Sequence, residues 1–284
     1  MKVYFVNGTS SWHFGSAAAV QSLKATLEKQ GHEIMYNCLR LERPDDRSVE
    51  DVDVVVVNGE GTFRDEAKNY EPGRIQQLRD FMTRALWLGK KTYLINTVWC
   101  RMRPGWWDLL KRLSGVAVRE PASALEMEKT TGVKPEVYVD AAYFLPLEPR
   151  LRLPHKGIGV GEVYSQNTTD GLTTPKLLET FGAVSISLLR NTWEDVVHGL
   201  WSCDVYITGQ HHGVLAACKA RCPFVPVRVN THKITGLFAW AGVDIPIATN
   251  LKETRDGVDW AEKHKDVFEK LFDFMEGQKP WPGI

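Results

Sequence analysis

Two adjacent histidines, His211 and His212, stand in a short polar segment directly after an apolar run at residues 205–207. Gly213 follows them, and residues 214–220 carry small side chains that suit a helix packed closely on a sheet. The pattern places the histidines at the carboxyl end of a strand and beside a helix N-terminus. Free N–H groups and the helix dipole favour a phosphate or carboxylate at such a place. The alternative interpretation is that both are ordinary loop or cap residues.

A second loop of the same construction lies in the first half of the chain. Residues 53–58 are a predicted strand with four valines at its centre, and Gly59-Glu60-Gly61-Thr62 follows it. Transfer of a group to a hydroxyl needs a base near the acceptor and positive or hydrogen-bond-donating groups near the donor. Because imidazoles titrate near neutral pH, His13 is the first candidate for this base and Glu60 the second. The alternatives are a packed loop histidine for His13, and a helix cap or a partner of Arg119 for Glu60.

The same reasoning yields three sets of site residues. The catalytic candidates are His13, Glu60, Asp65 and His212. The donor-binding candidates are Thr208, Gln210, His211, Gly213, Lys233 and Gly236, the last two from a predicted helix start at residues 230–236. The acceptor-binding candidates are Trp99, Arg101 and Arg103, an aromatic and basic strip after a strand, and also Arg119. Arg119 with Glu120 suits an interdomain or a substrate-orienting pair. If the acceptor is DNA, its phosphates would contact Arg101, Arg103, Lys111 and Arg112.

Alternating strand and helix patterns position these loops. The predicted strands cover residues 2–6, 33–39, 52–58, 91–97, 115–119, 136–139, 157–163, 184–187, 204–207 and 225–227. The predicted helices cover residues 16–30, 74–89, 106–113, 121–131, 174–181, 192–202, 214–220, 232–241 and 258–277. This order predicts an α/β protein of two Rossmann-like, doubly wound domains that face each other across a cleft, a GT-B-like arrangement.

The predicted domain boundary lies in a segment of prolines and alternating charges at residues 144–156. We expect an acceptor-side domain at residues 1–146, a donor-side domain at 147–256 and a closing C-terminal helix within 257–284. The cleft is expected to be lined by the loops at residues 7–15, 58–65, 208–213 and 230–236.

Composition limits the classes of function. Lys+Arg and Asp+Glu both total 35 in 284 residues, so the formal net charge is zero and gives no overall attraction to nucleic acid or acidic membranes. The five cysteines lack paired spacing, and Cys218 with Cys222 lacks the Cys-x-x-Cys pattern of a zinc site, so we expect reduced thiols and no metal. No apolar run approaches the about 20 residues that cross a bilayer. We therefore expect a cytoplasmic protein without a membrane span, whose only small molecule besides the acceptor is its donor co-substrate.

Four stretches, in order along the chain, together resemble the polysaccharide pyruvyl transferase family. They are residues 56–63, 116–125, 137–145 and 204–223. They carry a glycine loop after a strand, the Arg119-Glu120 pair before a helix, Asp140 at a strand end and His212-Gly213 after a strand. The resemblance implies transfer of a pyruvyl group from phosphoenolpyruvate to a sugar.

The chain departs from the family pattern at two places. The family has an arginine two residues before the position of His212, where this chain has Gln210. The family has Asn-x-Gly-Asp in the first loop, where this chain has His13-Phe14-Gly15-Ser16, so a hydroxyl replaces a carboxylate. Lys233 is the nearby residue able to supply the missing positive charge.

These observations predict a transferase that moves a group from an activated anionic donor to a hydroxyl. A neutral Gln210 favours a nucleotide sugar as donor, with a glycan or a hydroxylated DNA base as acceptor, because removal of a charge partner weakens binding of phosphoenolpyruvate. The alternatives are pyruvyl transfer from phosphoenolpyruvate to a polysaccharide, and a carbohydrate-binding protein without turnover.

Overall fold

The computed structural model describes the chain except residues 10–12, 41, 65–71, 103–106, 151–153 and 155–156. Packing divides it into two units. The N-terminal unit comprises Met1–Ser11, Ala19–Phe144 and Lys279–Ile284, and the C-terminal unit comprises Trp12–Ala18 and Leu145–Gln278. Residues 12–18 therefore group with the unit other than the predicted one, and residues 279–284, which are expected in a closing C-terminal segment, group with the N-terminal unit. Each unit has a parallel sheet with helices, which confirms the predicted α/β class.

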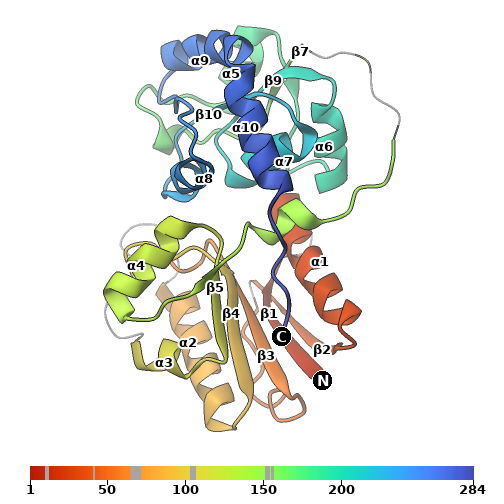
Figure 1. The fold of residues 1–284 in the computed structure, drawn as a ribbon, viewed down its shortest axis with the longest axis vertical. Coiled ribbons are helices and arrows are strands. Elements are labelled where there is room, and N and C mark those ends of the chain that lie inside the picture. The colour runs from red at the N-terminus through yellow and green to blue at the C-terminus, as the bar shows by residue number, and fades with distance from the viewer. Residues whose placement is uncertain (10–12, 41, 65–71, 103–106, 151–153, 155–156) are drawn as a thin grey trace. The chain divides into compact units, whose positions relative to one another are not determined.

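The N-terminal unit contains a six-stranded parallel sheet of order β2-β1-β3-β4-β5-β6 (Figure 1). Its strands are β1 (Lys2–Gly8), β2 (Glu33–Leu39), β3 (Val54–Glu60), β4 (Lys91–Thr97), β5 (Gly115–Val118) and β6 (Glu136–Val137). Its helices are α1 (Phe14–Lys29), whose first residues group with the other unit, α2 (Pro72–Trp87), α3 (Trp107–Arg112), α4 (Pro121–Thr131) and the 3₁₀ turn η1 (Ala141–Phe144).

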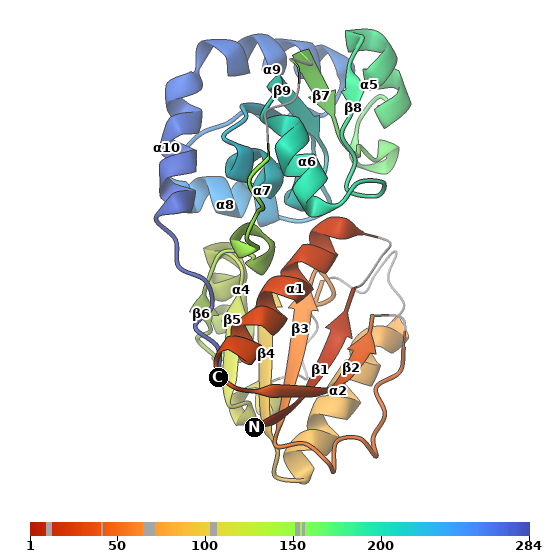
Figure 2. The same cartoon turned by 90° about the vertical axis from the view of Figure 1, so that its right-hand side faces the viewer.

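Helices cover both faces of this sheet, which explains why β1 and β3 are almost continuously apolar. Tyr4 and Val6 of β1 lie in one core cluster with Leu78 and Met82 of α2. Phe5 points to the other face, where the ammonium group of Lys24 on α1 lies 5.5 Å from its ring centroid. Figure 2 shows α1 and α2 on opposite faces of the sheet.

The C-terminal unit contains a four-stranded parallel sheet of order β10-β9-β7-β8. Its strands are β7 (Gly157–Val160), β8 (Val184–Ser185), β9 (Cys203–Thr208) and β10 (Phe224–Pro226). Its helices are η2 (Ser165–Asn167), α5 (Thr174–Phe181), α6 (Trp193–Leu200), α7 (His211–Ala220), α8 (Lys233–Ala241), α9 (Leu251–Lys263) and α10 (Lys265–Glu276). Helix α5 packs on β7, α9 packs on β9 and β10, and α6 packs on α7.

Two elements of this unit differ from the prediction. Helix α7 begins at His211, so both histidines are helical residues and not loop residues. The single helix predicted at residues 258–277 is wrong, because α9 and α10 are separated at His264, which has φ −117° and ψ 47°. The ring of His264 stacks on Trp260 at 4.4 Å, and its Nδ1 lies 2.8 Å from the Trp260 carbonyl oxygen. That local contact competes with continuation of the helix.

In both sheets the strand order reverses beside the first strand, between β1 and β3 and between β7 and β9. Open α/β sheets bind ligands outside the carboxyl ends of the strands at such a reversal. In the part of the chain that the structure describes, no helix has the length and apolarity to cross a membrane. None of the five cysteines, all of them described, forms a disulfide.

Candidate functional site

A chain of buried asparagines crosses the carboxyl edge of the N-terminal sheet. Asn7 donates through Nδ2 to the Asn58 carbonyl oxygen at 2.7 Å, and Asn96 donates to Asn58 Oδ1 at 3.2 Å. Arg74 of α2 donates to Asn7 Oδ1 at 3.1 Å. Asn7, Glu60 and Asn96 have positive φ angles of 67°, 47° and 52°. Such backbone strain in non-glycine residues is typical of functional sites.

Four arginines gather beside this edge, and we call them the arginine cluster: Arg40 after β2, Arg64 after the glycine loop of β3, Arg101 after β4 and Arg119 after β5. Arg40 Nη1 lies 4.0 Å from the buried Glu60 Oε2. A Cβ built on Gly61 would lie 3.8 Å from Arg119 Nη2, so this loop runs along the Arg119 side chain. Burial lowers the pKa of Arg64, and the positive charges of Arg40, Arg119 and Arg101 lower it further. Convergence of like charges is typical of a site whose ligand is an anion.

Arg40 and Arg64 are not among the site residues predicted from the sequence. Each follows the carboxyl end of a strand, and this position was the available signal. Arg119 was identified, but its partner is Asp140 and not Glu60: the two side chains are buried and form a hydrogen-bonded ion pair. Glu120 instead caps α4, accepting a hydrogen bond from the Ser123 backbone N–H at 2.9 Å.

Trp99 is a correction to the predicted acceptor strip. Its side chain is 0% exposed, its ring stacks on Phe63 with a centroid separation of 6.1 Å, and its Nε1 donates to Thr130 Oγ1 at 3.3 Å. The ring therefore belongs to the core and offers no open face to a sugar or base. From the sequence alone, an aromatic residue that packs in the core after a strand looks the same as one that stacks on a ligand.

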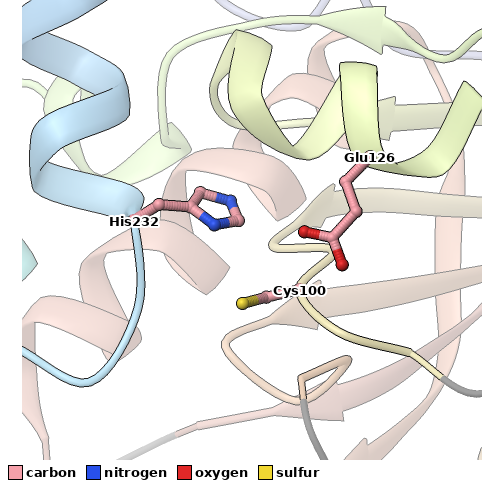
Figure 3. Close-up of side chains that lie close together, drawn as sticks. All are labelled: Cys100, Glu126 and His232. Carbon is pink, nitrogen blue, oxygen red and sulfur yellow. The ribbon is translucent and has the colours of Figure 1, made fainter. Parts of the chain in front are cut away.

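The other acceptor candidates have mixed outcomes. Arg101 is exposed, and its backbone N–H donates to the Glu126 carboxylate; Figure 3 shows Glu126 on α4 and Cys100, the residue before Arg101. His232, also labelled there, belongs to the C-terminal unit, where it precedes α8. Lys111 and Arg112 are exposed at the end of α3. Asp65 and Arg103 lie outside the described residues.

In the C-terminal unit, His13 and His212 lie side by side, and we call them the histidine pair. Their ring centroids are 5.3 Å apart in an edge-to-face arrangement, and the His211 ring lies 5.7 Å from that of His212. Residues 12–18 group with this unit, and the Phe14 N–H donates to the Leu188 carbonyl oxygen at 2.9 Å. Gly15 permits the approach, because a Cβ there would lie 2.5 Å from His212 Cβ.

The end of β9 sets the start of α7. Gln210 is the N-cap residue in an extended conformation, and its backbone N–H donates to Thr208 Oγ1 at 3.2 Å. A Cβ on Gly213 would lie 2.2 Å from that hydroxyl, so the helix can begin this close to the strand only with glycine there. Lys233 is the partly buried first residue of α8, and Gly236 donates from its N–H to the His232 carbonyl oxygen at 2.6 Å.

A buried carboxylate beyond β7, Glu162, is a residue that the sequence analysis missed. Its Oε1 accepts a hydrogen bond from the Ser187 hydroxyl, and its backbone carbonyl accepts one from Gly209 N–H at 2.7 Å. Gln210 Nε2 donates to the Tyr164 hydroxyl at 2.8 Å. Burial raises the pKa of Tyr164, the hydrogen bond from Gln210 acts in the opposite direction, and the charge of Glu162 adds to the rise.

Comparison with known proteins extends these observations. The sequence model of the family described as polysaccharide pyruvyl transferase matches residues 13–231, a range that includes the histidine pair, the arginine cluster and Glu162. No curated protein matches the chain in a sequence search.

Solved structures resemble the fold at low sequence identity. A UDP co-structure of MnaA from S. aureus has a TM-score of 0.60 at 11% identity and covers 96% of this chain and 90% of that one. The UDP-GlcNAc 2-epimerase from Neisseria meningitidis bound to UDP-GlcNAc gives 0.56 at 11% identity, covering 95% and 94%. The spinosyn rhamnosyltransferase SpnG complexed with thymidine diphosphate gives 0.54 at 11% identity, covering 99% and 98%. These likenesses support the predicted GT-B-like scaffold.

Proposed function

Because the chain belongs to the polysaccharide pyruvyl transferase family, we propose that this transferase moves a pyruvyl group from phosphoenolpyruvate onto two hydroxyls of a saccharide. The observation that carries the proposal is the histidine pair, whose ring centroids are 5.3 Å apart. One imidazole can accept a proton while its neighbour donates one, and this reaction needs both.

The chemistry explains the need for two proton carriers. The first saccharide hydroxyl adds through oxygen to C2 of phosphoenolpyruvate, and it loses its proton to a base. An acid protonates C3, which becomes a methyl group. The second hydroxyl then displaces phosphate from C2, and its proton leaves with the phosphate. The products are a cyclic pyruvate ketal and inorganic phosphate. The base imidazole now holds the proton that the acid imidazole has lost, so transfer of one proton from the first ring to the second restores the initial states.

The arginine cluster supports an anionic donor. Phosphoenolpyruvate carries a carboxylate and a phosphate, and guanidinium groups bind both with paired, charge-assisted hydrogen bonds. From the sequence alone, a nucleotide sugar is favoured because Gln210 is neutral where the family has a cation. Arg64, with Arg40 beside it, supplies positive charge at the edge of the N-terminal sheet, whereas Arg119 is paired with the buried Asp140. The charge of Arg64 and Arg40 removes that reason. We therefore assign the donor to these arginines rather than to the residues around Gln210.

A second candidate is glycosyl transfer from a nucleotide sugar to a glycan or a hydroxylated DNA base. Gln210 favours it, because a neutral amide at the cap of α7 suits a sugar hydroxyl better than a carboxylate. The solved relatives named above are described with UDP, UDP-GlcNAc or thymidine diphosphate bound, and this chain shares their fold. The third alternative, carbohydrate binding without turnover, leaves the histidine pair without a role.

The test incubates the protein with a panel of saccharides and either phosphoenolpyruvate or nucleotide sugars. We expect phosphate release and a new ketal methyl signal by NMR with phosphoenolpyruvate. His212→Ala and His13→Ala should each lower the rate by about 10²-fold or more, and His32→Ala in the N-terminal unit should not. Release of a nucleoside diphosphate without phosphate release from phosphoenolpyruvate would establish the second candidate instead.

A further inference from the structure

Two buried oxygen atoms at the carboxyl edge of the C-terminal sheet have no hydrogen-bond partner within the described part of the chain. They are Glu162 Oε2 and Gln210 Oε1, and their residues are 7% and 6% exposed. Buried acceptors without a partner are rare in folded proteins. Glu162 follows β7 and Gln210 follows β9, so both lie at the reversal point of the strand order.

Each of these side chains is fixed by its other polar atom. Glu162 Oε1 accepts a hydrogen bond from the Ser187 hydroxyl. Gln210 Nε2 donates to the Tyr164 hydroxyl at 2.8 Å. The backbone joins the two sites, because the Gly209 N–H donates to the Glu162 carbonyl oxygen at 2.7 Å. The open oxygens therefore belong to anchored groups on neighbouring strand ends, as expected of a preorganised binding site.

We propose that Glu162 Oε2 and Gln210 Oε1 form a subsite that accepts two hydrogen bonds from adjacent hydroxyls of a sugar ring. Both open atoms are acceptors, so the ligand must present donors, and a diol presents two. Phosphate and carboxylate groups present acceptor oxygens, and the negative charge of Glu162 repels them. This assignment rests on the proposed function for one point, that the diol belongs to the saccharide acceptor. It places that acceptor on the C-terminal unit, whereas the sequence analysis places the donor there.

A sugar diol can come from two sources, the saccharide acceptor or the ribose of a nucleotide, and the experiment separates them. Saturation-transfer NMR on the full-length protein would use methyl glycosides of glucose, galactose and mannose. Uridine and 2′,3′-dideoxyuridine form the second arm, since they differ only by the ribose diol. We expect at least one glycoside to bind and neither nucleoside to do so.

Three substitutions at two residues address the open oxygens directly. Glu162→Gln keeps the shape of the side chain but removes the charged acceptor, and it should weaken glycoside binding about tenfold. Glu179→Gln, at an exposed position on α5, is the matched control and should bind as the wild type does. Gln210→Leu should lose binding, while Gln210→Glu, which keeps an acceptor oxygen, should retain it. Thermal unfolding of each variant separates loss of binding from loss of fold.

Equal glycoside binding by the wild type and Glu162→Gln would overturn the subsite, as would the absence of binding by every diol. Binding of uridine but not of its dideoxy analogue, without any glycoside, would support the diol subsite and move its source to a nucleotide. That result would contradict pyruvyl transfer and favour the second candidate function. Consumption of phosphoenolpyruvate is measured in a separate experiment. If the protein binds a glycoside but does not consume phosphoenolpyruvate, the proposed function fails and the diol subsite stands.

Discussion

At Gly15, replacing a single hydrogen by a methyl group would bring a carbon atom within 2.5 Å of His212 Cβ. Real Cβ atoms do not tolerate such a contact, so the His212 ring must move away from His13. We expect Gly15→Ala to lower turnover strongly while the protein stays folded, because alanine suits a helix better than glycine does. Turnover and thermal unfolding, measured on the same sample, check both parts. Gly73→Ala on α2 is the control, since a Cβ there meets nothing within 4 Å and should leave turnover unchanged.

The arginine cluster makes a second prediction at the residue scale. Arg64→Gln removes one of the guanidinium groups that converge near Glu60 and Gly61. Hydrogen bonds to charged groups contribute about 1.5–3 kcal/mol, so the KM for phosphoenolpyruvate should rise about tenfold or more. The change should shrink at high ionic strength, because the interaction is electrostatic. Arg47→Gln, at an exposed position outside the cluster, should leave KM unchanged. An unaltered KM in Arg64→Gln would show that the donor does not bind at this edge of the sheet.

At the scale of elements, the hydrogen bonds that cap the start of α6 make the stability of the protein depend on pH. Thr192 is the N-cap, its hydroxyl accepts a hydrogen bond from the Asp195 N–H at 3.1 Å, and it donates to Asp195 Oδ2 at 2.6 Å. Arg150 Nη1 lies 2.7 Å from Asp195 Oδ1. The hydrogen bond from Thr192, followed by that from Arg150, lowers the pKa of Asp195.

A lowered folded-state pKa means that the ionised carboxylate stabilises the native protein above its unfolded pKa of about 3.9. This contribution is lost as the pH falls through the lower folded pKa. We therefore expect Asp195→Asn to reduce the free energy of unfolding at pH 7. The difference from wild type should disappear once the pH is below the folded-state pKa of Asp195. Urea unfolding at a series of pH values measures this difference. A constant difference down to the most acidic pH would show that packing, not charge, accounts for it.

At the scale of the whole molecule, the last six residues return to the N-terminal unit after the chain has formed the C-terminal unit. Trp281 is buried there and lines a small cavity with Leu23 and Val139. Gln30 Nε2 donates to the Pro282 carbonyl oxygen at 2.6 Å, and the Ile284 N–H donates to Gln30 Oε1 at 3.2 Å. The tail therefore forms part of the core and surface of a unit whose other residues come mainly from the first half of the chain.

Trp281→Ala should destabilise the N-terminal unit by about 3 kcal/mol, because it empties a buried position. Hydrogen exchange should report the loss in α1 and β5 and spare α7 and α9. Trp87→Ala is the matched control in the same unit. Trp87 is 71% exposed, so its removal should change the free energy of unfolding by no more than about 0.5 kcal/mol. Equal effects of the two substitutions would show that the tail does not stabilise this unit.

The sequence by itself determined the parallel α/β architecture and the position of most strand ends, because both depend on local periodicity. Apolar runs such as residues 54–57 and the glycines beyond them mark strands and turns without reference to the rest of the chain. The same local signals placed Gln210 and His212 where β9 gives way to α7.

Only the tertiary structure decided which distant residues share a site. Residues 12–18 pack with the C-terminal unit, so His13 meets His212. Arg64 and Arg119 converge because β3 and β5 end at the same edge of one sheet. Burial of Trp99, and of Glu162 with an open oxygen, likewise depends on neighbours supplied from other parts of the chain. Local periodicity specifies which face of a helix or strand is apolar. Long-range packing specifies which other element covers that face, and no local pattern in the sequence shows which two elements will pack together.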